Sequence, residues 1–396
     1  MTTLHADPLL TPEERVARRR LILRDALSLF TLFVITAVIF TLTWMLYRSF
    51  ENHREELGQR WKARGELALR EGRPKDAIEP LRSALAYVPD RSTEIDLATA
   101  YAESGKTTEA VAYFNTLWES APGDGTINLQ LARLAARQGN EALAVSHYEA
   151  ALDGTWQGNG YDVRRQVRLE LAGYLLSRGK VNQARTQLMI AAGNAPDDPA
   201  IKIQIAEMME QAKDLQDALG IYRSVAARRP TPIEALEGAG RDAFGLGMYR
   251  VAAEYLGRAA ADPAFAATDY AGKAAVRGML GTANRVLILY PAFDLAARAR
   301  AQRILALRDI ARKRLTACST AAPANAAPLS GLVARWAMVS TRLSAAELEQ
   351  QPDLEQSLMQ LIYDTETTTA RTCGPPTGDD ALLLRMAQNP NAVEQQ

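Results

Sequence analysis

The segment GRPKDAIEPLRSALAYVP (residues 72–89) recurs twice farther along the chain, with its small residues and its proline at the same spacing. It returns as GKTTEAVAYFNTLWESAP at 105–122 and as GKVNQARTQLMIAAGNAP at 179–196. Every copy begins with glycine and ends with proline. Spacings of about 33 to 34 residues between such segments are typical of helical repeat proteins. The three copies therefore predict an array of helix pairs.

Two sites of each predicted second helix carry residues of fixed size. A small residue occupies the first site, as Ala77, Ala110, Ala144, Ala184, Ala218 and Ala252. A bulky residue occupies the next site along, as Leu81, Phe114, Tyr148, Leu188, Tyr222 and Leu256. Because a side chain larger than a methyl group at the small site would push paired helices apart, this pattern predicts close helix packing.

Glycine and proline mark the predicted helix ends. Glycine is expected where the first helix ends and the chain turns through a left-handed conformation. These glycines are Gly72, Gly105, Gly139, Gly179 and Gly247. Proline is expected to stop the second helix, which it cannot continue. These prolines are Pro89, Pro122, Pro196, Pro230 and Pro263.

Together these residues resemble the tetratricopeptide repeat. Six repeats cover residues 58–264 and start near Gly58, Arg91, Gly125, Arg165, Pro199 and Ile233. The departures are Arg64 at a usually apolar position, a third repeat without its final proline, and Lys213 in place of a turn glycine. The resemblance implies an all-α fold, a superhelical solenoid whose concave face is lined mainly by first helices and binds peptides or partner helices.

An apolar run precedes the repeats. Residues 26–47 contain no charged side chain, and about 20 such residues suffice for a helix to cross a bilayer. The alternative is a cleavable signal peptide, but its apolar region is usually about 7 to 15 residues long and is followed by a small-x-small site. The sequence therefore predicts a single transmembrane helix after an N-terminal tail of residues 1–25.

Charges on the two flanks predict the orientation of this helix. The preceding flank carries Arg15, Arg18, Arg19, Arg20 and Arg24. The following flank carries Arg48 and Arg54 among Glu51, Glu55 and Glu56, although Arg60, Lys62 and Arg64 reduce the asymmetry. The positive-inside rule then favours a cytoplasmic N-terminus. The repeats would lie in the periplasm, tethered to a bacterial inner membrane.

The resemblance also implies which residues face the groove. They are Lys62, Glu66, Ile95, Thr99, Leu129, Arg133, Leu169, Ile203, Glu207, Glu237 and Arg241. The middle of this set is aliphatic, which suits the apolar stripe of a partner helix or an extended peptide. The carboxylate clamp of chaperone-binding repeats needs a coordinated set of Lys, Asn and Arg residues. Only Lys62 lies at such a position, so this clamp is not expected. Alternatively, the aliphatic residues pack against neighbouring repeats or a returning C-terminal segment.

The segment DGTWQGNGYD (residues 153–162) interrupts the repeat spacing. Its glycines match no phosphate-binding loop, and no predicted strand precedes them. The interpretation of this segment is an exposed loop between repeats, or a loop in which Trp156 is an aromatic anchor for a partner.

The remainder of the chain loses the repeat pattern. We expect a degenerate helical extension at 265–318, an Ala/Pro hinge at 319–328, a helical module at 329–388 and a tail at 389–396. Within the module, Ser344 and Glu347 predict a capping box at the start of a helix that continues to about Arg371. Cys318 and Cys373 are expected to form a disulfide if this part is periplasmic, and to be free thiols in a cytosolic domain.

Composition and motifs argue against several functions. The chain has 396 residues with 46 basic and 46 acidic side chains, so no basic field for nucleic acid is expected. His5, His53 and His147 are far apart, and no nucleophile, metal-ligand or nucleotide-binding motif is present. We therefore predict no enzyme activity, cofactor, metal or small-molecule substrate.

The predicted function is that of a membrane-tethered scaffold or adaptor that binds a protein partner in its groove, for the assembly of an envelope complex. One alternative is an integral structural subunit of a large membrane complex. In that case the membrane helix would contact a neighbour through Thr31, Thr36, Thr41 and Thr43. Another alternative is a regulatory subunit of a membrane enzyme or export system.

Overall fold

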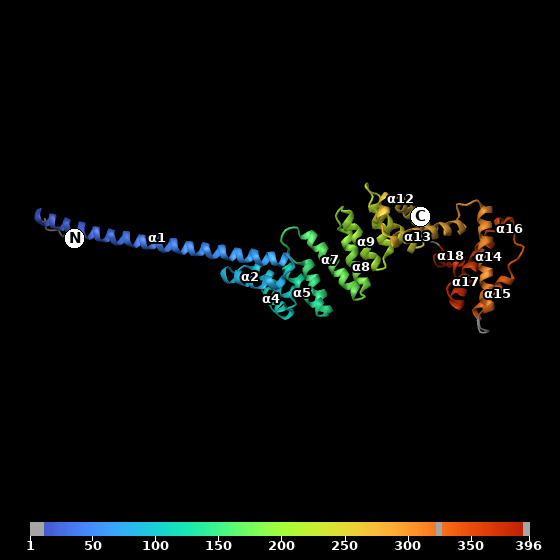
Figure 1. The fold of residues 1–396 in the computed structure, drawn as a ribbon, viewed down its shortest axis with the longest axis horizontal. Coiled ribbons are helices and arrows are strands. Elements are labelled where there is room, and N and C mark those ends of the chain that lie inside the picture. The colour runs from blue at the N-terminus through green and yellow to red at the C-terminus, as the bar shows by residue number, and fades with distance from the viewer. Residues whose placement is uncertain (1–11, 322–326, 391–396) are drawn as a thin grey trace, which may run out of the picture. The chain divides into compact units, whose positions relative to one another are not determined.

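The computed structural model describes residues 12–321 and 327–390. His5, the middle of the expected hinge and the last six residues lie outside these ranges. The described residues form helices and no named strand, which confirms the predicted all-α fold (Figure 1). The chain divides into unit 1, up to Gly158, and unit 2, from Asn159 onward.

Unit 1 begins with α1 (Pro12–Arg70), a single helix of 59 residues (Figure 1). The predicted membrane span and the first helix of the first repeat are both parts of it. The connecting residues 48–57 contain neither proline nor glycine, and ion pairs such as Arg60 with Glu56 at 2.6 Å support the helix. The span therefore continues into the repeats without a break.

Three helix pairs make up the repeats of unit 1. Helix α1 pairs with α2 (Pro74–Tyr87), α3 (Arg91–Glu103) with α4 (Thr107–Ser120), and α5 (Gly125–Arg137) with α6 (Glu141–Asp153). The small-site residues Ala77, Ala110 and Ala144 are fully buried, as predicted. Gly72, with φ of 68°, adopts the predicted left-handed turn.

Unit 2 begins with three further pairs. They are α7 (Gly160–Ser177) with α8 (Val181–Gly193), α9 (Pro199–Gln211) with α10 (Leu215–Ala226), and α11 (Ile233–Gly245) with α12 (Tyr249–Ala261). Lys213 stands in for a glycine and itself adopts the left-handed conformation, with φ of 59°. The fourth repeat starts earlier than expected, because α7 already includes Gly160.

The rest of unit 2 is also helical. It consists of η1 (Pro263–Ala267), α13 (Tyr270–Leu289), α14 (Ala297–Ala321), α15 (Ala327–Ala337), α16 (Ala345–Glu349), α17 (Pro352–Cys373) and α18 (Gly378–Gln388). The expected hinge is thus helical at both of its described ends. One hydrophobic core extends from the fourth repeat to α18.

The helix expected from Ser344 to about Arg371 is two helices, and the prediction of one was wrong. The capping box at its start is present, since Glu347 Oε2 accepts a hydrogen bond from the Ser344 amide at 2.8 Å. Pro352 occupies the first turn of α17, where its missing N–H costs nothing. The chain therefore restarts a helix at Pro352.

Candidate functional site

The candidate site is the face formed by the first helices of the repeats, on which the predicted groove residues lie. Six of these residues belong to unit 1 and five to unit 2.

In unit 1, Lys62 is committed to a contact between repeats. Its ammonium nitrogen lies 2.6 Å from Asp90 Oδ2, and the Asp90 carboxylate also accepts the amides of Ser92 and Thr93 at the start of α3. The hydrogen bond from Lys62 holds the pKa of Asp90 well below its usual range and raises the pKa of Lys62. Lys62 therefore ties the first repeat to the second.

An acidic pair lies beside this contact. Glu66 is partly exposed, and Asp96 on α3 is partly buried. Burial and then the neighbouring Glu66 charge raise the pKa of Asp96. Sequence reasoning missed Asp96, because a single acidic residue on a helix carries no signal that it lies near another carboxylate.

The other predicted groove residues of unit 1 are less accessible than expected. Leu129 is 8% exposed, and Ile95 packs partly against the core. The Thr99 hydroxyl donates to the Ile95 carbonyl at 2.8 Å, while Arg133 is partly exposed. The accessible surface of this face is therefore less aliphatic than the sequence predicts.

In unit 2, the same pattern holds with more acidic residues. Leu169 is 8% exposed, Ile203 packs partly against the core and Glu207 is exposed. Arg241 donates from Nε and Nη2 to Glu210 Oε1, at 3.1 and 2.6 Å. Glu210 was not predicted as a site residue, and its ion pair occupies the side chain of Arg241.

A buried carboxyl group lies next to this ion pair. Asp242 is 1% exposed and lies against the Glu210 carboxylate, to which its protonated form can donate a hydrogen bond. Burial, with the nearby Glu210 charge, raises the pKa of Asp242 to about 8. Burial also raises the pKa of Glu237, a predicted groove residue. The exposed carboxylate among the predicted groove residues of unit 2 is therefore that of Glu207.

Trp156 is held by its own repeat. Its indole nitrogen donates to the Ala151 carbonyl at 2.9 Å, and its ring leaves no room for a Cβ at Gly125. The adjacent Thr155 accepts the Gly125 amide at 2.9 Å and donates to the Gly123 carbonyl at 2.8 Å. Trp156 therefore packs against the start of α5, with its hydrogen-bonding group used inside the chain.

The apolar part of α1 is exposed along its length and is long and apolar enough to cross a membrane. Its threonine hydroxyls donate to carbonyls of the same helix. The pairs are Thr31 with Ser28, Thr36 with Leu32, Thr41 with Ala37 and Thr43 with Ile39, at 2.6 to 2.8 Å. These hydroxyl protons are therefore satisfied without a neighbouring helix.

Cys318 and Cys373 lie at disulfide-bonding distance, with Cα atoms 5.8 Å apart. The pair links the end of α14 to the end of α17. Within residues 12–321 and 327–390, no group of three or more His, Cys, Asp and Glu side chains is arranged to hold a metal ion.

Comparisons with known proteins identify the repeats. The family model described as tetratricopeptide repeat matches residues 95–159 and 169–231. A comparison with curated proteins finds no match.

Several solved structures are similar over about half of the chain. One, from a functional characterisation of pilF of Pseudomonas aeruginosa, is 19% identical, covers 52% of this chain and 91% of its own, and has a TM-score of 0.39. PilW, described as a widely conserved type IV pilus biogenesis factor, is 18% identical, with coverages of 58% and 98% and a TM-score of 0.38. YrrB, described as a protein with an unusual peptide-binding site, is 16% identical, with coverages of 50% and 97% and a TM-score of 0.38.

Proposed function

Because this chain carries tetratricopeptide repeats, we propose that it is a membrane-tethered scaffold that binds a peptide or helix of a partner protein on the first-helix face of the repeats. The observation that carries the proposal is the continuity of α1, whose exposed apolar part leads directly into the first repeat. The chain has no catalytic role of its own in this proposal, and its partner is part of an envelope complex.

Helix α1 also limits where the first repeat lies. Arg54 Nε donates to the Tyr87 carbonyl at 2.9 Å, which fastens α1 to the end of α2. Arg54 lies only seven positions after Tyr47, the last residue of the apolar run. At about 1.5 Å per residue along α1, the contact with the end of α2 lies roughly 10 Å from the apolar run. The partner segment that it binds is therefore close to the membrane surface.

The charge of the first-helix face suggests the chemistry of the partner. Glu66 in unit 1 and Glu207 in unit 2 are accessible carboxylates at predicted groove positions, and Glu66 has a long ion pair with Arg70 at 3.6 Å. Lys62 and Arg241 instead pair closely with Asp90 and Glu210. Opposite charges across an interface favour the correct partner and its orientation. We propose a partner segment that places basic side chains next to apolar ones.

The proposed location is the periplasm, with the N-terminus in the cytoplasm. The flanking charges of α1 and the pairing of Cys318 with Cys373 support it, because disulfides persist in oxidising compartments. The structural-subunit alternative is less favoured, since the threonine hydroxyls of α1 bond to their own helix.

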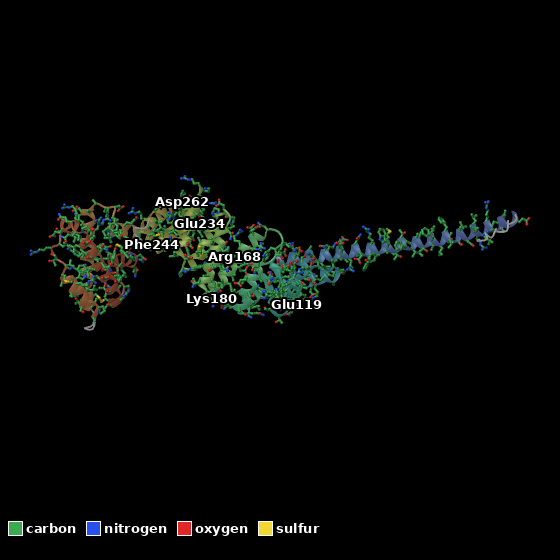
Figure 2. All side chains as sticks on the ribbon, turned by 180° about the vertical axis from the view of Figure 1, so that it is seen from behind. Glu119, Arg168, Lys180, Glu234, Phe244 and Asp262 are labelled. Atoms are coloured by element: carbon green, nitrogen blue, oxygen red, sulfur yellow. A yellow bond between two sulfur atoms is a disulfide. The ribbon has the colours of Figure 1, made fainter. Side chains whose placement is uncertain are left out.

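An in-cell crosslinking pull-down of the full-length protein tests the proposal. The variant Glu66→Lys/Glu207→Lys reverses charge on the first-helix face at accessible positions, whereas a change at Leu129 would disturb buried packing. The control Glu119→Lys/Asp217→Lys makes the same charge change on exposed positions of second helices; Glu119 is labelled in Figure 2. We expect the first variant to lose a partner that the control retains. A partner captured equally by both variants would contradict binding on this face.

A further inference from the structure

A second surface of unit 2 is a cleft of about 910 Å³ where α10 and α12 end and α11 begins. None of the predicted groove residues lines it. Four arginines do, namely Arg223, Arg228, Arg229 and Arg258. The acidic lining residue is Asp262, labelled in Figure 2, whose carboxylate accepts the Ala264 amide at 2.8 Å. The cleft is therefore rich in cations.

Two of the arginines are fixed by contacts within the protein. Arg228 pairs with the Asp197 side chain and donates to the Asp197 carbonyl at 3.0 Å. Arg258 donates to the Ala226 carbonyl at 3.2 Å, and its guanidinium carbon lies 5.2 Å from the centre of the Tyr255 ring. Because these contacts use only some of the five N–H donors of each guanidinium, both side chains can still donate into the cleft.

The other two arginines have no internal counter-charge. Arg223 and Arg229 are exposed, and neither forms an ion pair with any residue in the part of the chain that the structure describes. A position in the last turn of α10 suits Arg223, because a cation there is favoured by the helix dipole. Arg229 lies beyond the helix, where that explanation does not apply. Two unmatched cations thus face one cleft.

The floor of the cleft is apolar. Leu236 and Ala226 are buried, and Pro230, Pro263 and Tyr255 complete the surface. None of the lining residues is a large, exposed apolar side chain of the kind that inserts into a lipid interface. Guanidinium groups above an apolar floor instead suit a peptide, whose carboxylates accept bidentate hydrogen bonds while its backbone covers the floor.

We propose that this arginine cleft, lined by Arg223, Arg228, Arg229 and Arg258, binds an acidic peptide segment of the partner protein, with two carboxylates held by Arg223 and Arg229. The inference rests on the proposed scaffold function and gives the partner a second contact of opposite charge. A single partner that engages both surfaces presents a basic segment to the first-helix face and an acidic segment to the arginine cleft.

The test uses the full-length protein in detergent and a fluorescein-labelled peptide with two glutamates separated by two alanines. Fluorescence polarisation measures its affinity, and the glutamine counterpart of the peptide reports binding without charge. Arg223→Gln/Arg229→Gln should weaken binding of the glutamate peptide by about tenfold or more. The control Arg298→Gln/Arg342→Gln removes the same charge from exposed positions of unit 2 and should change affinity less than about twofold. Equal losses in the two variants would overturn the inference.

Two further measurements make the result specific. Inorganic phosphate or phosphatidylglycerol vesicles that bind the wild-type protein through the same arginines, while the peptide does not, would assign the cleft to another anion and overturn the peptide assignment. In the crosslinking pull-down, a cleft variant that retains the partner would refute the second contact, while loss in the Glu66→Lys/Glu207→Lys variant would leave the scaffold proposal intact. Loss of the partner from the cleft variant, with retention by the Glu66→Lys/Glu207→Lys variant, would support binding in the cleft and refute binding on the first-helix face.

Discussion

The repeats and the carboxy-terminal helices (α13–α18) are both all-α, but contacts of different range hold them together. In the repeats, hydrogen bonds join adjacent repeats. For example, Arg137 donates to the Ala102 carbonyl, 35 positions away. In the carboxy-terminal helices, Arg285 pairs with Asp379 across 94 positions, and Arg300 forms a bidentate pair with Glu355 across 55. A repeated local pattern therefore specifies the first region, and distant pairings specify the second.

The largest expected effect distinguishes the two regions through the disulfide. Replacing both cysteines, as Cys318→Ser/Cys373→Ser, opens a loop of 55 positions and should lower the free energy of unfolding of the carboxy-terminal helices by about 4 kcal/mol. Hydrogen exchange on the full-length protein measures this effect. Amides of α14–α17 should exchange faster, and those of α3–α6 in unit 1 should keep their protection.

A reductant provides the control for this prediction. Dithiothreitol should reproduce the variant in the wild-type protein and change nothing further in the variant. Faster exchange in α3–α6 as well would mean that the repeats of unit 1 depend on the disulfide, and the contrast between local and distant contacts would fail.

The same contrast explains what the sequence could predict. Ala110 and Phe114 were assigned to buried sites correctly, because each repeat restates the packing rule in neighbouring residues. Ser344 and Glu347 likewise form the capping box that their spacing predicts. In all three cases the determining residues lie close together in the sequence.

The site was less predictable, because its partners are distant. Lys62 was expected to face a ligand but contacts Asp90, and Arg241 contacts Glu210, 31 positions away. Asp242 had one usable signal, since it is the only acidic residue in the small-residue run GAGRDAFG. Such a residue in a tightly packed helix is a candidate for burial. The arginine cleft carried no sequence signal, because its lining comes from α10, α11, α12, η1 and the residues that connect them.

A smaller effect tests the packing rule of the repeats. Ala110→Leu adds bulk at a fully buried small site of α4 and should cost about 1–3 kcal/mol of unfolding free energy. The control Ala112→Leu makes the same change at an exposed position of the same helix and should alter stability by less than about 0.5 kcal/mol. Urea unfolding followed by circular dichroism measures both. Similar costs at the two positions would show that the small site is not what brings the helices together.

The smallest effect concerns a feature that the two regions share. Glu366 on α17 is fully buried, as Asp242 is on α11, and neither carboxylate oxygen of Glu366 forms a hydrogen bond within the described residues. Burial raises the pKa of each carboxyl group to about 8. The nearby acidic residue, Glu210 beside Asp242 and Asp380 beside Glu366, raises the pKa further, whereas the nearby arginine, Arg241 or Arg314, lowers it. The repeats and the carboxy-terminal helices, although stabilised by contacts of different range, therefore each contain a buried carboxyl group with a raised pKa.

The sign of the pH dependence follows from these raised pKa values. Between the unfolded pKa of about 4 and the folded pKa of about 8, the folded state keeps a proton that the unfolded state releases. The stability that each protonated group contributes is complete below about pH 4 and is lost as the pH rises through about 8. Asp242→Asn and Glu366→Gln keep the neutral form at every pH. Each variant should gain on the wild-type protein as the pH rises. Between pH 7 and pH 9 the wild-type protein should lose about 1–2 kcal/mol of stability that each variant keeps.

Thermal unfolding at pH 5, 7 and 9 measures these differences, and hydrogen exchange assigns each one to its region. The gain from Asp242→Asn should be found in α9–α12, whereas the gain from Glu366→Gln should be found in α14–α18. Because unit 2 has one continuous core, equal gains across both regions would instead mean that α9–α18 unfold as one cooperative element. In that case the repeats and the carboxy-terminal helices would differ in how the sequence specifies them, but they would unfold together.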